Sequence, residues 1–257
     1  MPGSFFGRRL CASLLLVTLA VAASAQTMSN PWLEALAERD LAALSRLLES
    51  GPVNPNLALP GGQTALMLAA RKADAELAVQ LIAAGANVNA SNANGGTALM
   101  FASIGGDAGL VGLLLDAGAR HDAKAKLGWT ALSLAAVKGH TEVARVLLDF
   151  GANQGARDAY GWTALMRAAD NRRIGIVRLL LEAAAADLSV TQEAGATVLH
   201  IAAASGDPDV VELLLARGAD IAARDASGNT PTDTAMASGH FELAEYLRSL
   251  EARAGER

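Results

Sequence analysis

Residues 128–153 read GWTALSLAAVKGHTEVARVLLDFGAN, and the glycine and threonine that open this stretch recur along most of the chain. Six threonines, each with a glycine two residues earlier, are separated by 33, 33, 33, 34 and 33 residues. They are Thr64, Thr97, Thr130, Thr163, Thr197 and Thr230. A fixed period of this size predicts one supersecondary unit that is copied along a solenoid, in which each copy covers the apolar face of its neighbour.

Each unit is expected to contain a turn and two helices. Gly128 permits a turn with positive φ, and Thr130 follows at the point where a hydroxyl caps the first free N–H groups of a helix. Leucines and alanines give this first helix a core face, and Gly139-His140 breaks it. An apolar stripe at helical spacing then predicts a second helix, which Gly151 ends.

These elements resemble the ankyrin repeat, which shares the Gly-x-Thr-Ala-Leu start, the Gly-His turn and the Gly-Ala-Asn end. In the fourth copy the matching segments are residues 128–132, 139–140 and 151–153, and the resemblance covers residues 30–254, or seven copies with both ends included. It implies an all-α repeat solenoid, elongated and curved, with a hairpin loop and two antiparallel helices in every copy. The concave face would consist of hairpin tips and first helices. Ankyrin proteins as a family bind other proteins and share no catalytic residues.

The first 25 residues are predicted to be a signal peptide. Arg8 and Arg9 precede an apolar stretch of about 14 residues, Leu10–Ala23, which is too short for a comfortable membrane span. Residues 23–25, Ala-Ser-Ala, form a cleavage site, so that segment 1–25 would be removed after Ala25. An uncleaved N-terminal anchor is the alternative. The prediction is a periplasmic or secreted protein that has no membrane contact after cleavage.

Composition narrows the functions open to the mature chain. The only cysteine, Cys11, lies in the predicted signal peptide, so neither disulfides nor thiolate chemistry is expected. Removal of residues 1–25 leaves 19 basic and 26 acidic residues, a net charge of 19 − 26 = −7. This charge argues against nucleic acid or an anionic membrane surface as the main partner.

The chain shows no pattern that is typical of a catalytic or metal site. His140 and His240 occupy the Gly-His turn, and His200 occupies the histidine of the ankyrin Thr-Pro-Leu-His element, so the resemblance gives all three a structural role. His121 stands at an otherwise apolar position, and no histidine pair or cysteine completes a metal site. No nucleophile elbow, phosphate loop or paired carboxylate stands out. We therefore expect no cofactor, no metal and no enzyme activity.

Differences between the copies indicate where a partner would bind. The residue before the repeat threonine is tryptophan in two adjacent copies only, at Trp129 and Trp162. Two positions earlier the same copies carry Leu127 and Tyr160, where the others have glycine, asparagine, alanine or serine. Because neighbouring copies stack about 10 Å apart, these four side chains are expected to form one patch on adjacent hairpins. The alternative is that the tryptophans pack between hairpins, and the two roles are compatible.

A polar cluster is expected beside this aromatic patch. Arg167 replaces an apolar residue on the first helix of copy five, and Asp170 and Asn171 occupy positions that vary in the ankyrin family. Lys138 ends the corresponding helix of copy four. An aromatic centre with an arginine-containing polar rim has the composition of a protein-binding hot spot. The locally basic balance predicts an acidic segment in the partner.

Taken together, these features predict an exported, monomeric ankyrin solenoid that binds another protein in the bacterial periplasm. Two alternatives stay open. One is a secreted effector that acts on a host or neighbouring cell, and the other is an enzyme.

Overall fold

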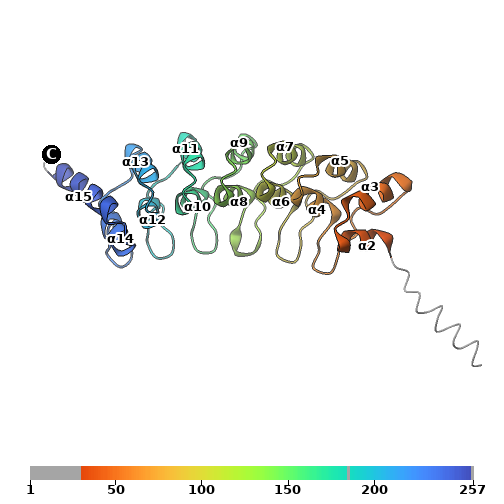
Figure 1. Ribbon diagram of the computed structural model, residues 1–257, viewed down its shortest axis with the longest axis horizontal. Coiled ribbons are helices and arrows are strands. Elements are labelled where there is room, and N and C mark those ends of the chain that lie inside the picture. The colour runs from red at the N-terminus through yellow and green to blue at the C-terminus, as the bar shows by residue number, and fades with distance from the viewer. Residues whose placement is uncertain (1–29, 184–185, 256–257) are drawn as a thin grey trace, which may run out of the picture.

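The computed structural model describes residues 30–183 and 186–255 of the 257-residue chain. The predicted signal peptide, residues 1–25, lies outside them. The described part is an elongated, gently curved row of helix pairs, with the first pair at one end and the last pair at the other (Figure 1). Loops between consecutive pairs extend from one side of the row, so this side carries the hairpin positions predicted from the repeat.

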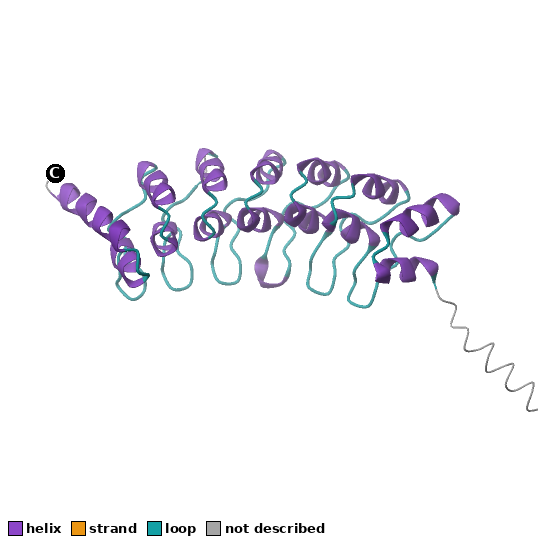
Figure 2. Cartoon of the chain, viewed as in Figure 1, coloured by secondary structure: helices purple, strands orange, loops and turns teal. Residues whose placement is uncertain are grey.

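Seven pairs of α-helices make up the described residues, and each pair has an inner helix next to the loops and an outer helix behind it (Figure 2). The inner helices are α2 (Pro31–Glu38), α4 (Ala65–Arg71), α6 (Ala98–Gly105), α8 (Ala131–Lys138), α10 (Ala164–Asp170), α12 (Val198–Ser205) and α14 (Pro231–Ala237). The outer helices are α3 (Leu41–Ser50), α5 (Ala75–Ala83), α7 (Ala108–Asp116), α9 (Thr141–Asp149), α11 (Ile174–Glu182), α13 (Pro208–Ala216) and α15 (Phe241–Gly255). This arrangement confirms the predicted all-α repeat solenoid.

The recurring threonines start the inner helices. The hydroxyls of five of them accept a hydrogen bond from the backbone N–H three residues later, at Thr64, Thr97, Thr130, Thr163 and Thr230. In copy four the bond is reciprocal, because the N–H of Thr130 donates to Ser133 Oγ over 2.9 Å. Thr197 differs, since its hydroxyl lies 2.9 Å from Nδ1 of His200. These contacts satisfy helix N-terminal groups that would otherwise be buried without partners.

Small residues bring the inner helices together. Ala135 and Ala136 on α8 are fully buried, as are Ala168 and Ala169 on α10, so that the backbones of these neighbouring helices approach closely. The outer helices carry larger core residues, such as Leu147 on α9, and from copy two onward they contact one another less than the inner helices do. Closer packing on the inner side fits the curvature of the row toward the loops (Figure 1).

The loops are linked to one another by a repeated backbone hydrogen bond. Lys126 N donates to Asn94 O and Ala159 N donates to Leu127 O, each over 2.8 Å. Equivalent bonds join residues 93 and 61, 193 and 160, and 226 and 194. The hairpin tips are therefore held in a fixed order along one edge of the solenoid, and two of them carry the candidate site.

Basic side chains at the Gly-His position connect copies four, five and seven to the copy before each of them. In copies two, three and six an aspartate stands at this position and caps its own outer helix. His140 Nε2 lies 3.1 Å from Ile104 O in this role. Arg173 takes the same position in copy five, and its Nε donates to Val137 O over 3.1 Å. The basic residue at this position therefore serves packing between copies, which agrees with the structural role that the resemblance implied for the histidine.

Two observations concern metal binding and membrane spanning. Within residues 30–183 and 186–255, no group of three or more His, Cys, Asp or Glu side chains is placed to hold a metal ion. Every helix in the same segments is too short or too polar to span a bilayer.

Candidate protein-binding site

The turn before α10 is organised by Asp158. Its Oδ1 atom accepts hydrogen bonds from the backbone N–H groups of Tyr160 and Trp162, each over 2.9 Å. Asn92 makes the same two bonds in copy three, to the N–H groups two and four residues later. The turn itself is therefore common to several copies, and the difference lies in the second oxygen of Asp158.

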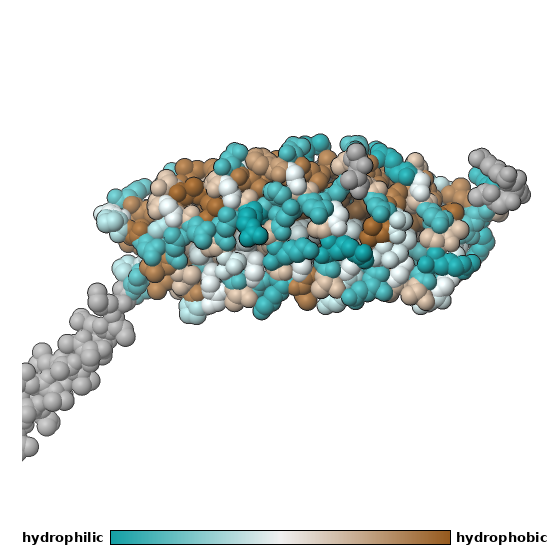
Figure 3. Space-filling model, turned by 180° about the vertical axis from the view of Figure 1, so that it is seen from behind, coloured by the Kyte–Doolittle hydropathy of each residue, from teal (hydrophilic) through white to brown (hydrophobic). Residues whose placement is uncertain are grey.

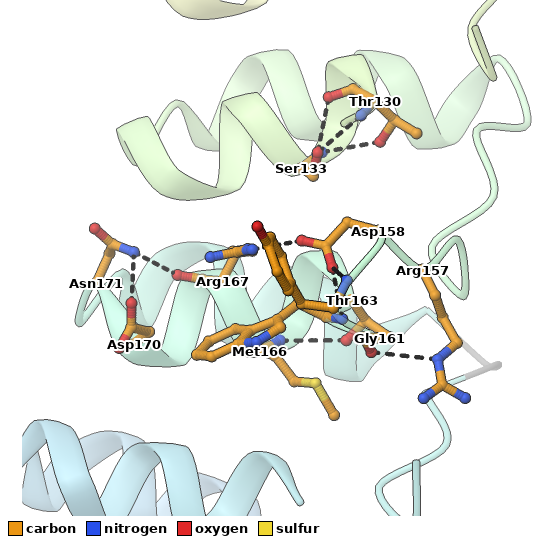
Figure 4. A network of polar contacts seen from close by, with 12 residues as sticks. Thr130, Ser133, Arg157, Asp158, Gly161, Thr163, Met166, Arg167, Asp170 and Asn171 are labelled. Carbon is orange, nitrogen blue, oxygen red and sulfur yellow. Dashed lines mark hydrogen bonds and ion pairs between the residues drawn. The ribbon is translucent and has the colours of Figure 1, made fainter. Parts of the chain in front are cut away.

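This second oxygen pairs with Arg167, nine residues later on α10 (Figure 4). The side chains of Asp158 and Arg167 are only 4% and 16% exposed, so the pair is largely withdrawn from water. Burial alone would raise the pKa of Asp158, but hydrogen bonds from Arg167 and from the two turn N–H groups outweigh burial and hold the pKa below its ordinary value of 3.8. The carboxylate is therefore ionised at neutral pH and compensates the charge of the arginine.

The guanidinium of Arg167 is stacked between two indole rings. Its central carbon lies 4.5 Å from the centroid of the Trp129 ring and 4.4 Å from that of the Trp162 ring. A cation in this position is attracted to the face of each ring. Since Trp129 belongs to copy four and Trp162 to copy five, the arginine joins the two hairpins. We call these residues, together with Asp158, the arginine cluster.

Two large apolar side chains lie exposed at the hairpin tips beside the arginine cluster. Tyr160 is 48% and Leu127 53% exposed, whereas both tryptophans are half-buried. The backbone of each tip is fixed, because the carbonyl of Leu127 accepts from Ala159 N over 2.8 Å and that of Tyr160 accepts from Glu193 N over 3.1 Å. The hairpins thus present two exposed side chains on a braced base.

The remaining predicted residues lie at the far ends of the inner helices. Figure 4 shows Asp170 and Asn171 at the end of α10 that is opposite Asp158. Asn171 Nδ2 donates to Arg167 O over 2.9 Å, so this amide closes the helix end. Asp170 and Lys138 are exposed. The structure therefore brings Arg167 and the two tryptophans together, and it places Asp170, Asn171 and Lys138 on the helix surface beyond them.

Arg167 lies inside the aromatic patch, which revises the expectation of a rim arginine. Several neighbouring basic residues also serve the fold: Arg157 donates to Gly161 O over 3.2 Å, and Lys124 donates to Arg157 O over 3.2 Å. In the described part of the chain, the amino groups of Lys126 and Lys138 make no hydrogen bond or ion pair with a side chain or carbonyl. The exposed positive charge of the site comes from these two lysines together with Lys124 and Arg157, whose carbonyl partners leave their charges unneutralised.

Sequence reasoning did not identify Asp158 as a member of the site. The signal that could have found it was the charge of Arg167, because an arginine at a position that is apolar in other copies needs a counter-charge nearby. Asp158 is the acidic residue of the adjoining turn. Because Asp158 has the same turn-forming role as Asn92, the sequence did not indicate its ion pair with Arg167.

The chain belongs to the ankyrin repeat family. The family model described as "Ankyrin repeats (3 copies)" matches residues 33–125, 105–192 and 184–256. Among solved structures, the chain is similar to the human ASB11 ankyrin repeat domain, with 29% sequence identity and a TM-score of 0.74 over 85% of this chain and 97% of that one. No curated protein gives a significant match. Ankyrin repeats generally mediate binding to other proteins, so the class of protein defined here is a protein-interaction module.

Proposed function

We propose that the chain is an exported, non-catalytic protein-binding module that acts as a monomer in the bacterial periplasm. Membership of the ankyrin repeat family supports the binding role. The export and the compartment rest on the segment 1–25 and its Ala-Ser-Ala site. Release as an effector toward another cell is the alternative, and it differs in the route taken after export.

The observation that carries the binding proposal is the exposure of Tyr160 and Leu127 on a braced base. Large side chains that are held in place before binding lose little conformational entropy when a partner covers them. The arginine cluster supplies this support, because it fixes the two hairpins relative to each other. Tyr160 would then act as the central anchor of a hot spot.

An acidic segment is the proposed partner chemistry. Lys126 and Lys138 are exposed and make no ion pair in the described residues, while the charge of Arg167 is already met by Asp158. The positive field at the site would therefore come from the exposed basic residues rather than from Arg167. Binding should weaken as salt is added, because exposed charge pairs are screened over about 10 Å at 0.1 M ionic strength.

Export is tested by cell fractionation and N-terminal sequencing of the expressed protein. The expected mature protein starts at Gln26 and is recovered outside the cytoplasm. A Leu15→Arg change should block translocation, since a charge in the apolar segment costs about 2–3 kcal/mol on insertion scales. Wild-type protein that stays in the cytoplasm with Met1 intact would disprove the export proposal.

Binding is tested with a partner captured by a photo-crosslinker placed at exposed position 159, next to Tyr160, and then titrated against variants. Tyr160→Ala should weaken binding by about 2 kcal/mol, or roughly thirtyfold. The matched control is Ser227→Ala, at the same repeat position two copies further on. Thermal melts of both variants must match wild type. Equal affinities of the two variants would place the binding site elsewhere.

A further inference from the structure

A second surface lies on the outer helices at the C-terminal end of the solenoid. A groove of about 500 Å³ opens between α13 and α15. It is lined mainly by Pro208, Glu212, His240, Phe241, Glu242 and Tyr246. In the view from behind, hydrophobic side chains gather along the upper edge, over the outer helices (Figure 3). The groove is therefore part of the outer row and is separate from the hairpin tips.

The floor of the groove is fixed by His240. Its Nε2 lies 3.1 Å from Ala204 O, and its ring covers Gly206 so closely that an added Cβ there would lie 2.3–2.5 Å from ring atoms. The imidazole is thus held by the preceding copy. A surface with a fixed floor is suited to binding, because little of it needs to be ordered by the ligand.

Two aromatic side chains are exposed on one wall of the groove. Phe241 is 62% and Tyr246 37% exposed, and both lie on α15. Copy four carries Thr141 and Val146 at the same two positions. Exposed aromatic side chains that share one groove offer a large apolar contact area to another molecule.

The charged groups of the groove are acidic. Glu212 from α13 and Glu242 from the first turn of α15 line it, and no lysine or arginine of the described residues does. Aromatic faces beside carboxylates attract a cationic side chain, by the ring quadrupole and by charge together. The apolar area of Phe241 would at the same time accept an aliphatic neighbour of that cation.

From this combination we infer that the groove between α13 and α15 binds a segment of a partner protein in which a lysine or arginine adjoins an apolar residue. The charge preference is opposite to that of the hairpin site, which is proposed to bind an acidic segment. The two surfaces lie on different helices of different copies. One chain can therefore hold two unlike segments at once, and this inference stands independently of the hairpin site.

The test uses a phage-displayed library of random linear peptides, selected on the full chain and counter-selected on its Phe241→Ser variant. The recovered peptides should be enriched in lysine or arginine next to an apolar residue. A synthetic copy of the strongest peptide is then titrated by fluorescence anisotropy. Phe241→Ala and Glu212→Gln should each lower its affinity by about tenfold, which corresponds to a cation–π or charge-assisted contact in a partly desolvated site.

Two matched controls make the result specific. Glu142→Gln removes the carboxylate at the repeat position of Glu242 in copy four, and Tyr160→Ala removes the anchor of the hairpin site. Both should leave the peptide affinity within about twofold of wild type, well below the tenfold step. The inference is overturned if the recovered peptides are acidic or uncharged, if no peptide discriminates against Phe241→Ser, or if the groove variants bind as tightly as the controls.

Discussion

Arg167 stands at a position where copies two, three, four and six carry Leu68, Phe101, Leu134 and Ile201. A cation that replaces an apolar side chain costs free energy unless other groups meet its charge. Here one carboxylate and two indole rings do so. The arginine therefore acts as a packing residue whose charge is used inside the protein, and its removal should affect stability first and binding second.

The ion pair can be tested by Asp158→Asn, which keeps the Oδ1 acceptor of the turn and removes the charge. The variant should lose about 2 kcal/mol of unfolding free energy, because a largely buried arginine would lack its counter-charge. Urea unfolding at neutral pH gives the value. Asp225→Asn is the matched control, because Asp225 accepts the same turn bonds, and in the described part of the chain its second oxygen meets the amide of Asn229 instead of an arginine. Equal losses in both variants would assign the effect to the turn.

The same pair should make stability depend on pH in a defined direction. Because the pKa of Asp158 is lowered in the folded chain, its contribution is fully present above the ordinary value of 3.8 and is lost as pH falls through the folded pKa. The difference in unfolding free energy between wild type and Asp158→Asn should be constant from neutral pH down to about pH 5, and should then shrink in more acidic solution. Urea titrations at stepped pH measure it. A difference that persists unchanged to about pH 2 would contradict the assignment.

At the scale of elements, each hairpin is shaped both by its own backbone and by the next hairpin. Gly128 and Gly228 occupy the same repeat position, with φ of 80° and 85°. An added Cβ at Gly128 would lie 2.9 Å from Asp158 Cα, whereas one at Gly228 would meet nothing within 4 Å. The two positions thus share the strain of positive φ, and only Gly128 has a neighbouring turn against it.

Alanine substitutions at Gly128 and Gly228 distinguish the strain of the turn from crowding between adjacent hairpins. Gly128→Ala should destabilise the chain by at least about 1 kcal/mol more than Gly228→Ala, since the clash is with backbone that cannot move aside easily. Thermal and urea melts of the two variants provide the comparison. Similar losses would mean that adjacent hairpins can separate at little cost.

Much of this architecture could be predicted from sequence, because the caps, apolar stripes and glycine turns agree in most copies. The prediction failed in detail at Arg167. Spacing along the chain gives the position of a residue within its copy, but it does not give the offset between copies that brings Trp129 over the guanidinium. A charged residue on a helix beside a loop ordinarily faces water. Tyr160 and Leu127 were easier to place, because a hairpin tip is exposed in any packing of the copies.

At the scale of the whole molecule, five of the six junctions between copies share one hydrogen bond between hairpin tips. The hydrogen bond from Lys126 N to Asn94 O has an equivalent 33 residues earlier, from Ala93 N to Gly61 O. Asn56 likewise donates to Gly85 O, as Asn89 does to Gly118 O, each 29 residues later. Because contacts repeat with the period of the sequence, stability should be close to a sum over copies and junctions.

Removal of one whole copy tests this additivity. Deletion of residues 65–97 takes out 33 residues and joins Thr64 to Ala98, so every junction can form again. The shortened chain should fold with the helical circular dichroism of the parent and a modestly lower melting temperature. Deletion of 65–99 also removes buried Leu99 and turns the rest of α6 by about 200° relative to its cap, and should be far less stable. Equal melting temperatures of the two deletions would refute the additive description.

The positions of the tryptophans have a further consequence for fluorescence measurements on this protein. The chain has three tryptophans, and each emits according to its surroundings. Trp32, 2% exposed, lies in the first helix pair, whereas Trp129 and Trp162 both lie against one guanidinium at the centre of the row. Intrinsic tryptophan fluorescence therefore reports on two separate regions of the protein. Binding of a molecule at Tyr160 would change the emission spectrum of Trp129 and Trp162. Loosening of the N-terminal helix pair alone would change the emission of Trp32.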